Sequence, residues 1–364
     1  MIDAEPAVFR DRMTCIWAKA STLGLDALLF LDMTNIRYLS GFTGSDGALI
    51  IGREMAVLLV DGRYTTQATQ EVYSAEVFEY KDKVEGIAQT LLQEGWKRVG
   101  LESQAMTLQV YLELRDKLLG VELKPLGEEI CAIRAVKDRT EVDRIKKAAD
   151  ISTDALLSTL TRVRPGVSEK DIALELEYQI RGGGAESVSF EIIVASGDNA
   201  SMPHAKPGAR RFESGDFVVL DYGAVYEGYC SDETCTIALG NISERQREVY
   251  DIVKEAHDNA IHSVRAGASC SGIDRQARSI IEEKGLGKYF SHGTGHGVGL
   301  CVHEEPRISS LSKSCLEAGM VITIEPGVYF PGLWGIRIED VVLVKEDGCD
   351  VLTTIPKDLK IVEF

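Results

Sequence analysis

The sequence feature that most constrains this chain is a pair of acids at the ends of two strand-like segments. An apolar run over 217–220 ends at Asp221, and Asp232 follows eleven residues later, beyond a turn that contains glycine. Side chains on a strand alternate between two faces, so Asp221 shares its face with Val219. If residues 225–228 form the turn, the returning strand places Asp232 on the same face. The chain therefore carries two carboxylates that face a protein interior.

Such a pair of buried acids needs a partner. Two carboxylates ~4 Å apart repel by about 4 kcal/mol at an effective dielectric of about 20. The loss of water around each charge adds a desolvation cost. A shared proton or a bound cation would relieve the repulsion, whereas a solvated hairpin with two ordinary acids would avoid it. The choice among these three depends on the rest of the chain.

The composition excludes several classes of protein. The 364 residues are enough for two domains with separate cores. A formal net charge of −17 argues against nucleic acid and anionic membrane surfaces as partners. Residues 1–6 lack the pattern of a signal peptide, and the apolar runs at 27–31 and 56–60 are too short to cross a bilayer. The eight cysteines form no C-x-x-C pair, which favours reduced thiols and a cytoplasmic location.

The first third of the sequence predicts a small α/β domain that ends near residues 125–135. Strands are expected at 26–31, 47–51, 56–60 and 98–101, and helices at 6–23, 84–95 and 107–119. This alternation of elements is typical of an α/β domain. The segment from Asp61 to Tyr64 is interpreted as a turn with a charge pair, and nothing in this region has obvious catalytic chemistry.

The rest of the sequence predicts a duplicated α+β unit. Asp138 with Glu141, and Ser243 with Gln246, have the spacing of capping boxes that begin long helices. A helix pair followed by strands is expected twice, over 139–182 then 188–238 and over 244–284 then 296–345. No convincing repeat of the residues themselves accompanies this pattern.

Histidines and further acids gather in the second half of the chain. Four of the six histidines fall in three short patches, 203–205, 291–299 and 302–306. The glycine-rich patch around His296 is a weak match to a phosphate loop, because no helix pattern follows it. Its glycines instead allow backbone to pass close to a site. The remaining histidines, His257 and His262, lie within a helix and are interpreted as surface or packing residues.

Two strands near the C-terminus add Glu325 and Glu339 to the acids of the central pair. Each alone would be a charged residue at a strand edge. Four carboxylates with one imidazole, however, are a suitable ligand set for two hard or borderline divalent ions. Two such ions can share a water, lower its pKa and stabilise a tetrahedral intermediate. The absence of cysteine from the set favours manganese, cobalt, iron or zinc over a structural zinc site. The ligands in this set are Asp221, Asp232, His296, Glu325 and Glu339.

These five residues and their neighbours resemble the metallopeptidases of the pita-bread fold. The similarity covers nearly the whole chain and is greatest to the proline-specific branch, aminopeptidase P and prolidase. It implies an α+β protein with a creatinase-like α/β domain over 1–128 and a pita-bread catalytic domain over 129–364. It also implies two divalent cations, of which Mn²⁺ is the first choice, with Co²⁺, Zn²⁺ or Fe²⁺ as alternatives.

The resemblance also implies a role for each residue. Asp221 would chelate one metal and His296 the other, Asp232 and Glu339 would bridge them, and Glu325 would bind beside His296. A metal-bridging hydroxide would be the nucleophile, with Glu325 as its proton shuttle. Three further histidines and one arginine would act around the substrate. His303 would steady the oxyanion, His204 and His292 would contact the prolyl substrate, and Arg337 would hold a ligand carboxylate or orient the substrate.

Two cysteines depart from the pattern of the family. Cys235 stands where many relatives have arginine, and strand alternation turns it away from Asp232, so a packing effect is expected. Cys301 stands where an acid often precedes Val302 and His303. Its position suggests sensitivity to oxidation or to soft metals.

We therefore expect an Xaa-Pro aminopeptidase that acts on small peptides with proline at the second position, as a homodimer without nucleic-acid or membrane partners. The alternative within the branch is an Xaa-Pro dipeptidase, or prolidase, that cleaves dipeptides only. A non-catalytic pita-bread binding module and creatinase would lack the five ligands. Methionine aminopeptidase shares the ligand pattern but normally lacks the N-terminal domain.

Overall fold

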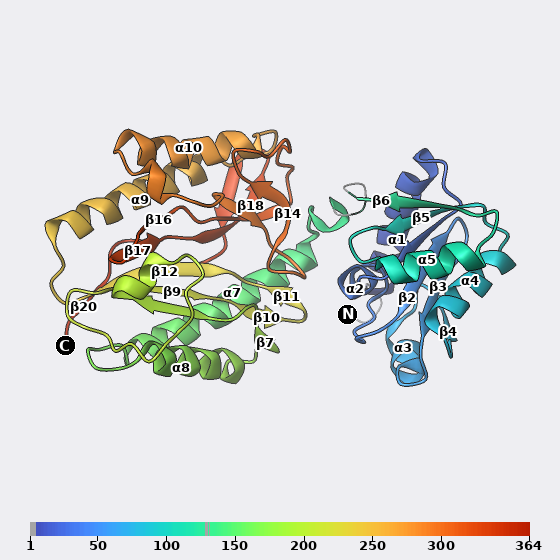
Figure 1. Cartoon of the computed structure of the whole chain (residues 1–364), viewed down its shortest axis with the longest axis horizontal. Helices are drawn as coiled ribbons and strands as arrows, with labels where there is room; N and C mark the ends of the chain where they lie inside the picture. The colour runs from blue at the N-terminus through green and yellow to red at the C-terminus, as the bar shows by residue number, and fades with distance from the viewer. Residues whose placement is uncertain (1–4, 128–129, 131) are drawn as a thin grey trace. The chain divides into compact units, whose positions relative to one another are not determined.

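The computed structural model describes residues 5–127, 130 and 132–364, and the chain divides into two compact units, Met1–Ile133 and Arg134–Phe364. The expected domain boundary between residues 128 and 129 lies outside the described residues, as do residues 1–4 of the segment that lacks a signal-peptide pattern. Both units mix helices and strands, which confirms the predicted α+β class (Figure 1).

The first unit is a six-stranded mixed sheet with helices packed around it. The strand order is β4-β3-β2-β1-β5-β6. The strands are β1 (Ala27–Phe30), β2 (Ala48–Gly52), β3 (Ala56–Val60), β4 (Glu76–Glu79), β5 (Arg98–Glu102) and β6 (Glu122–Leu126), and the helices are α1 (Glu5–Thr22), α2 (Met33–Ser40), α3 (Thr65–Glu71), α4 (Lys83–Gln93) and α5 (Leu108–Lys117). The three central strands are almost entirely buried, because helices cover both faces of the sheet.

Four elements of this unit were not predicted. The helices α2 and α3 have only eight and seven residues, too few for a clear apolar period. The outer strands β4 and β6 are largely exposed or partly exposed, so they lack the apolar run that marks a buried strand. The predicted turn after β3 is confirmed, with Arg63 paired to Asp61 at 2.6 Å.

The second unit contains the duplicated pattern of helix pair and strands. The first half has α7 (Arg139–Leu160), α8 (Glu169–Gly182), β7 (Ser187–Val188), β8 (Ile193–Ser196), the 3₁₀ helix η2 (Gly197–Ser201), β9 (Phe217–Tyr222), β10 (Ala224–Tyr226), β11 (Tyr229–Cys230) and β12 (Glu233–Leu239). The second half has α9 (Glu244–Ser263), α10 (Cys270–Glu283), η3 (Gly287–Tyr289), β13 (Gly295–Gly297), β14 (Glu304–Ile308), β15 (Val321–Ile324), β16 (Gly327–Phe330), β17 (Trp334–Arg337), β18 (Asp340–Lys345) and β19 (Gly348–Val351). A short 3₁₀ turn, η1 (Ala132–Arg134), precedes these halves, and β20 (Ile361–Val362) ends the chain. Both predicted capping boxes are present.

Each half buries its helix pair against its own strands. Figure 1 shows α7 and α8 on one side of the strands and α9 and α10 on the other. The side chains of Val218, Leu220 and Tyr222 pack with α7 and α8, whereas Ile322, Ile324 and Val342 pack with α9 and α10. The opposite faces of the strands are therefore left to line the space between the two halves.

No helix in the described part of the chain is long and apolar enough to span a membrane.

Candidate metal centre

The site is built where strands from the two halves end near each other. In the antiparallel pair of β9 and β12, Thr234 lies directly opposite Asp221 and Thr236 opposite Val219, as the predicted register requires. The turn of the adjoining hairpin is made by Glu227 and Gly228 alone, both with positive φ. Asp221 therefore points away from the helices that cover β9 and into the space between the halves.

Three of the predicted ligands already form a cluster. One ligand atom each from Asp232, His296 and Glu339 lies within 4.8 Å of the other two. The two acids come from different halves, because Asp232 directly precedes β12 and Glu339 directly precedes β18. Both acids are nearly inaccessible, at 4% and 2% exposed. This arrangement leaves room for one ion held by both halves.

His296 reaches the cluster because glycines flank it. A side chain on Gly295 would lie 2.0 Å from the carbonyl oxygen of Thr323, and one on Gly297 would lie 2.2 Å from that of Glu305. Only glycine allows backbone to pass so close on both sides. The ring Nδ1 of His296 donates to the Gly297 carbonyl at 3.1 Å, which leaves Nε2 as the free ligand atom.

Glu325 and Asp221 complete the set. The Oε1 of Glu325 lies 3.5 Å from His296 Nε2, on the residue that follows β15. Asp221 accepts a hydrogen bond from Arg337 on its Oδ2, while its Oδ1 is buried without a hydrogen-bond partner among the described residues. Arg337 thus contacts the carboxylate of a predicted ligand.

The electrostatics of this pocket favour a bound cation. Burial, followed by the neighbouring acids Glu339 and Asp221, raises the pKa of Asp232 well above its usual range. Burial and the charges of Glu325 and Asp221 do the same to the pKa of Glu339. Burial raises the pKa of Glu325 to about 7. Burial, with His303 nearby, lowers the pKa of His296 to about 4, so its ring is neutral.

The residues present fit a pair of divalent ions. Buried carboxylates with raised pKa values, a neutral imidazole with a free Nε2 and the unpartnered oxygen of Asp221 are the donors that such ions require. An oxygen-rich set with one nitrogen and no thiolate suits manganese, iron, cobalt or zinc.

The other predicted site residues surround this cluster. The rings of His303 and His296 meet edge to face, with centroids 4.4 Å apart. His204 is exposed, and the neighbouring carbonyl of Pro203 accepts a hydrogen bond from Arg337 at 3.1 Å. His292 is connected to Arg337 through Tyr329. The Nε2 of His292 is 3.1 Å from the Tyr329 hydroxyl, which accepts a hydrogen bond from Arg337 at 2.7 Å.

Several residues of the site were missed from the sequence. Tyr329 links His292 to Arg337, and Thr234 donates to Glu339 at 2.6 Å. Nothing in the sequence distinguishes them from the other tyrosines and threonines on strands. Arg307 lies opposite His296 in the pair of β14 and β13, and its register could have been inferred only from the structure.

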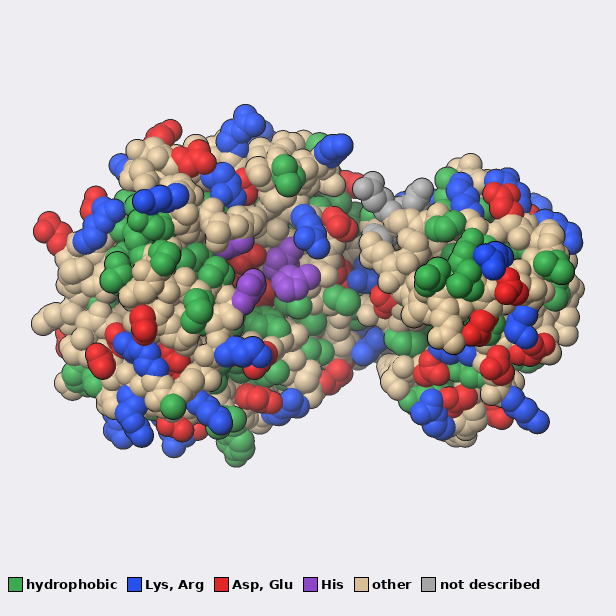
Figure 2. All heavy atoms as spheres, in the orientation of Figure 1, with side chains coloured by type: hydrophobic (Ala, Val, Ile, Leu, Met, Phe, Trp, Pro, Cys, Tyr) green, Lys and Arg blue, Asp and Glu red, His purple; other side chains and the backbone are tan. Residues whose placement is uncertain are grey.

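Figure 2 shows histidine side chains gathered on one face of the larger unit, with acidic side chains among them. Cys301 is half-buried, with its Sγ 3.8 Å from Nη2 of Arg134. The seven described cysteines are all free thiols.

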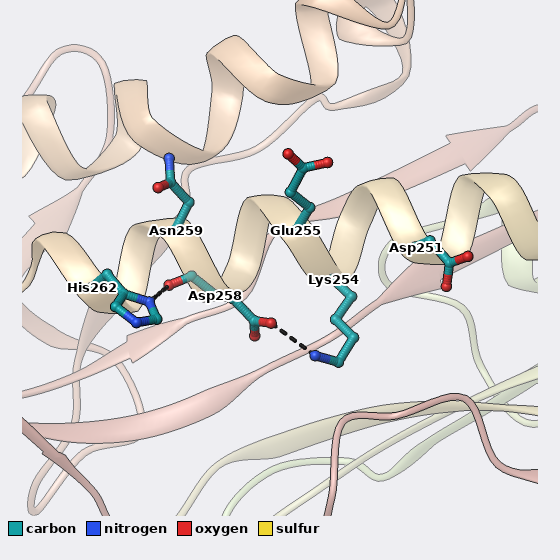
Figure 3. A pocket seen from close by; sticks show the side chains of 6 residues that line it. All are labelled: Asp251, Lys254, Glu255, Asp258, Asn259 and His262. Atoms are coloured by element: carbon teal, nitrogen blue, oxygen red, sulfur yellow. Dashed lines mark hydrogen bonds and ion pairs between the residues drawn. The ribbon is translucent and has the colours of Figure 1, made fainter.

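A second polar groove, of about 610 Å³, lies along the outer face of α9 and is unrelated to this cluster (Figure 3). Its side chains all come from one helix, and two of them form an ion pair. Lys254 lies 2.8 Å from Asp258, and the Nδ1 of His262 donates to the Asp258 carbonyl at 2.6 Å. The groove therefore offers no converging set of free ligands.

The chain matches two family models. Residues 143–346 match the model of metallopeptidase family M24, and residues 12–136 match that of the creatinase/prolidase N-terminal domain. The first match covers more than half of the chain.

The chain is similar to proteins named as Xaa-Pro dipeptidases and to one named as an X-Pro aminopeptidase. A protein named Xaa-Pro dipeptidase from Pyrococcus horikoshii is 38% identical over 92% of this chain and 94% of its own length. A solved structure of an Xaa-Pro dipeptidase from Bacillus anthracis is 36% identical, with a TM-score of 0.94 over 97% of this chain and all of its own. That of an X-Pro aminopeptidase from Thermotoga maritima is 39% identical, with a TM-score of 0.87 over 95% of this chain and all of its own.

Proposed function

Because this chain belongs to metallopeptidase family M24, we propose that it hydrolyses Xaa-Pro dipeptides, as a metal-dependent Xaa-Pro dipeptidase. The sequence favoured the aminopeptidase and kept the dipeptidase as the alternative. Relatives named as dipeptidases match this chain from end to end, which supports the alternative more than the first expectation.

The observation that carries the proposal is a lone cation beside the cluster. Arg307 is exposed on β14, directly across from His296, and residues opposite each other on neighbouring strands share a face. It lies close enough to contribute to the lowered pKa of His303, after burial. Arg307 has no carboxylate partner among the described residues. A guanidinium in this place suits the C-terminal carboxylate of a dipeptide, which an internal peptide bond would not offer.

We assign the metal ligands as the sequence predicts them: Asp221, Asp232, His296, Glu325 and Glu339. Divalent cations in such a site supply an acidic water as nucleophile and polarise the scissile carbonyl. Mn²⁺ is our first choice of cation, with Co²⁺, Zn²⁺ or Fe²⁺ as alternatives.

The chain's own residues would handle the substrate and the proton. Glu325, whose Oε1 lies beside His296, would take a proton from the attacking water and pass it to the proline nitrogen as that bond breaks. His303, beside His296, would donate a hydrogen bond to the developing oxyanion. His204 would contact the substrate from the exposed rim, and His292 would act on it through Tyr329 and Arg337.

The test compares Ala-Pro with Ala-Pro-Ala, which differ only at the C-terminal side of proline, and uses Ala-Ala-Ala as a control without proline. We expect the manganese-loaded protein to cleave Ala-Pro and to leave Ala-Pro-Ala and Ala-Ala-Ala intact. Asp232→Asn should abolish cleavage, because it removes a charged ligand. Arg307→Gln should raise KM for Ala-Pro at least tenfold while KM for Ala-Pro amide, which lacks the carboxylate, stays the same.

Cleavage of Ala-Pro-Ala at a rate comparable to Ala-Pro would instead establish the aminopeptidase. The similarity to the Thermotoga maritima structure keeps that activity as the second candidate. The proposal includes a cytoplasmic homodimer that acts on small peptides, and the mass of the protein in solution tests the dimer.

A further inference from the structure

Each of two metal ligands is followed by a second buried acid. Glu233 follows Asp232 at the start of β12, and Asp340 follows Glu339 at the start of β18. Successive side chains on a strand point to opposite faces. The second acid of each pair is therefore turned away from the cluster, and both are buried, with Glu233 0% and Asp340 6% exposed.

A single lysine joins these two acids. The Nζ of Lys357 forms an ion pair with Oε1 of Glu233 and lies 3.2 Å from Oδ1 of Asp340. Lys357 itself is only 8% exposed. Burial lowers the pKa of this amine, but the two carboxylates outweigh burial and raise it, so the ammonium is charged at neutral pH.

Lys357 connects the two halves of the catalytic unit. Glu233 belongs to the first half and Asp340 to the second, so the ammonium links strands that β pairing does not join. The backbone of this lysine is held in turn: its carbonyl accepts from the hydroxyl of Tyr250 on α9 at 3.1 Å. After it, β20 pairs in parallel with β12.

Both acids are satisfied by further buried groups. The hydroxyl of Tyr222 donates to Oε2 of Glu233 at 3.0 Å, and Thr353 donates to Oδ1 of Asp340 at 2.5 Å. Well-packed apolar residues of similar volume often stabilise such a place as well as buried charges do. Stability alone therefore does not explain the network. Its two acids directly follow the predicted ligands Asp232 and Glu339, which suggests a role in placing those ligands.

We propose that Lys357 is a positioning residue for the metal centre: by holding Glu233 and Asp340 together, it fixes the spacing of Asp232 and Glu339. This inference rests on the metal site of the proposed function and does not depend on the substrate. The spacing of these two ligands decides whether one ion can contact both halves at once. Removal of such outer partners of metal ligands typically weakens metal binding by about 10- to 100-fold.

The experiment measures metal affinity in variants matched for buried charge. Lys357→Met alone leaves two buried carboxylates without their cation and risks unfolding. The double variant Lys357→Met with Glu233→Gln removes one positive and one negative charge, so the net buried charge is unchanged. This variant is the one that tests the inference. Lys360→Met, three residues further on and exposed, is the control. Circular dichroism and thermal unfolding of the metal-free proteins establish the temperature at which all of them are folded.

At that temperature we expect Mn²⁺ to bind about 10- to 100-fold more weakly to the double variant than to wild type. The Lys360→Met control should bind within twofold of wild type. Equal affinity in wild type and the folded double variant would overturn the inference, even if the variant melts earlier. A wild type that binds manganese but does not cleave Ala-Pro would refute the proposed substrate alone, whereas a wild type that binds none of Mn²⁺, Co²⁺, Zn²⁺ and Fe²⁺ would overturn both.

Discussion

The guanidinium of Arg337 lies 2.5 Å from Oδ2 of Asp221, and the other oxygen of that carboxylate is buried without a hydrogen-bond partner in the described part of the chain. The same guanidinium donates to the hydroxyls of Tyr329 and Thr234 and to the carbonyl of Pro203. Four acceptors therefore fix its plane. Through Arg337, Asp221 is oriented with one oxygen held and one oxygen free for a cation.

This contact predicts that Arg337→Lys loses metal affinity although it keeps the charge. An ammonium is a point donor and cannot reproduce the planar set of hydrogen bonds. Arg337→Met, which leaves the Asp221 carboxylate buried without its cation, should lower the free energy of unfolding by about 3–5 kcal/mol. Urea denaturation and titration with Mn²⁺ measure both effects. Arg275→Lys on the exposed face of α10 is the control, and equal metal affinity in the two lysine variants would refute the prediction.

Metal binding should release protons near neutral pH. Burial and neighbouring acids raise the pKa of Asp232 and Glu339 well above their usual range, and burial raises that of Glu325 to about 7. The metal-free site therefore holds protons at pH 7, and a cation must displace them. We expect affinity for Mn²⁺ to fall as the pH drops from 8 to 6.

Calorimetry in buffers of different ionisation enthalpy measures this release directly. The observed enthalpy of Mn²⁺ binding should change with the buffer, by an amount that corresponds to at least about one proton per site. Free Mn²⁺ at a thousandfold excess over Kd should also stabilise the fold by about 4 kcal/mol. An enthalpy that is the same in all buffers would show that the acids are already ionised without metal.

The five predicted ligands could be named from the sequence partly because three of them break a local pattern. Asp221 lies one residue before the end of the apolar strand β9, Glu325 directly follows the apolar strand β15, and His296 stands between glycines, so simple alternation and steric reasoning mark them. The first helix of each pair was predictable because its capping box lies within three residues of the sequence. Such signals lie within a few neighbouring residues, so they can be recognised in the sequence without knowledge of the fold.

The roles of residues that support the predicted ligands, such as Tyr329 and Lys357, were not predictable, because their contacts join distant segments of the chain. Tyr329 looks like any strand residue, and only its position beside Arg337 gives it a role. Lys357 looks like a lysine in a polar tail, and its two acids are 124 and 17 residues away. Short elements such as α3 were missed for another reason, since seven residues carry too little periodicity to distinguish a helix.

His257 should make the stability of the fold depend on pH. Its ring is buried, with Nδ1 3.1 Å from Asp258 and Nε2 3.3 Å from Asp340, the second contact being an ion pair without hydrogen-bond geometry. Burial lowers the pKa of His257, but the two acids outweigh burial and raise it. A raised pKa stabilises the folded state below about pH 6.5, and this contribution disappears as the pH rises through the folded-state value.

We therefore expect His257→Gln to reduce the loss of stability between pH 6 and pH 9, because the variant lacks the group whose pKa folding raises. Urea denaturation of the metal-free protein at each pH measures the difference. His262→Gln, on the exposed end of the same helix, is the matched control and should follow wild type. Parallel pH profiles for the two variants would exclude a role for the His257 pair.

Glu304 anchors the loop that carries His303. Its carboxylate lies 2.9 Å from Arg134 Nε and 3.3 Å from Lys137 Nζ, and it accepts a hydrogen bond from the backbone of Cys301 at 3.0 Å. Glu304 and Lys137 are both buried. The residue that follows His303 is thus held by charges from the segment that leads into α7.

Lys137→Met should therefore lower kcat/KM for Ala-Pro, although Lys137 touches neither the substrate nor a predicted ligand. The Glu304 carboxylate loses one of its two cations, and the loop can then shift His303 away from the oxyanion. We expect a loss of unfolding free energy of up to about 3–5 kcal/mol, as for other broken buried ion pairs. We also expect kcat to fall more than KM rises, because His303 is assigned to the transition state. Lys146→Met, on an exposed part of α7, controls for the loss of a lysine. An unchanged kcat in a folded Lys137→Met protein would mean that Arg134 alone holds the loop in place.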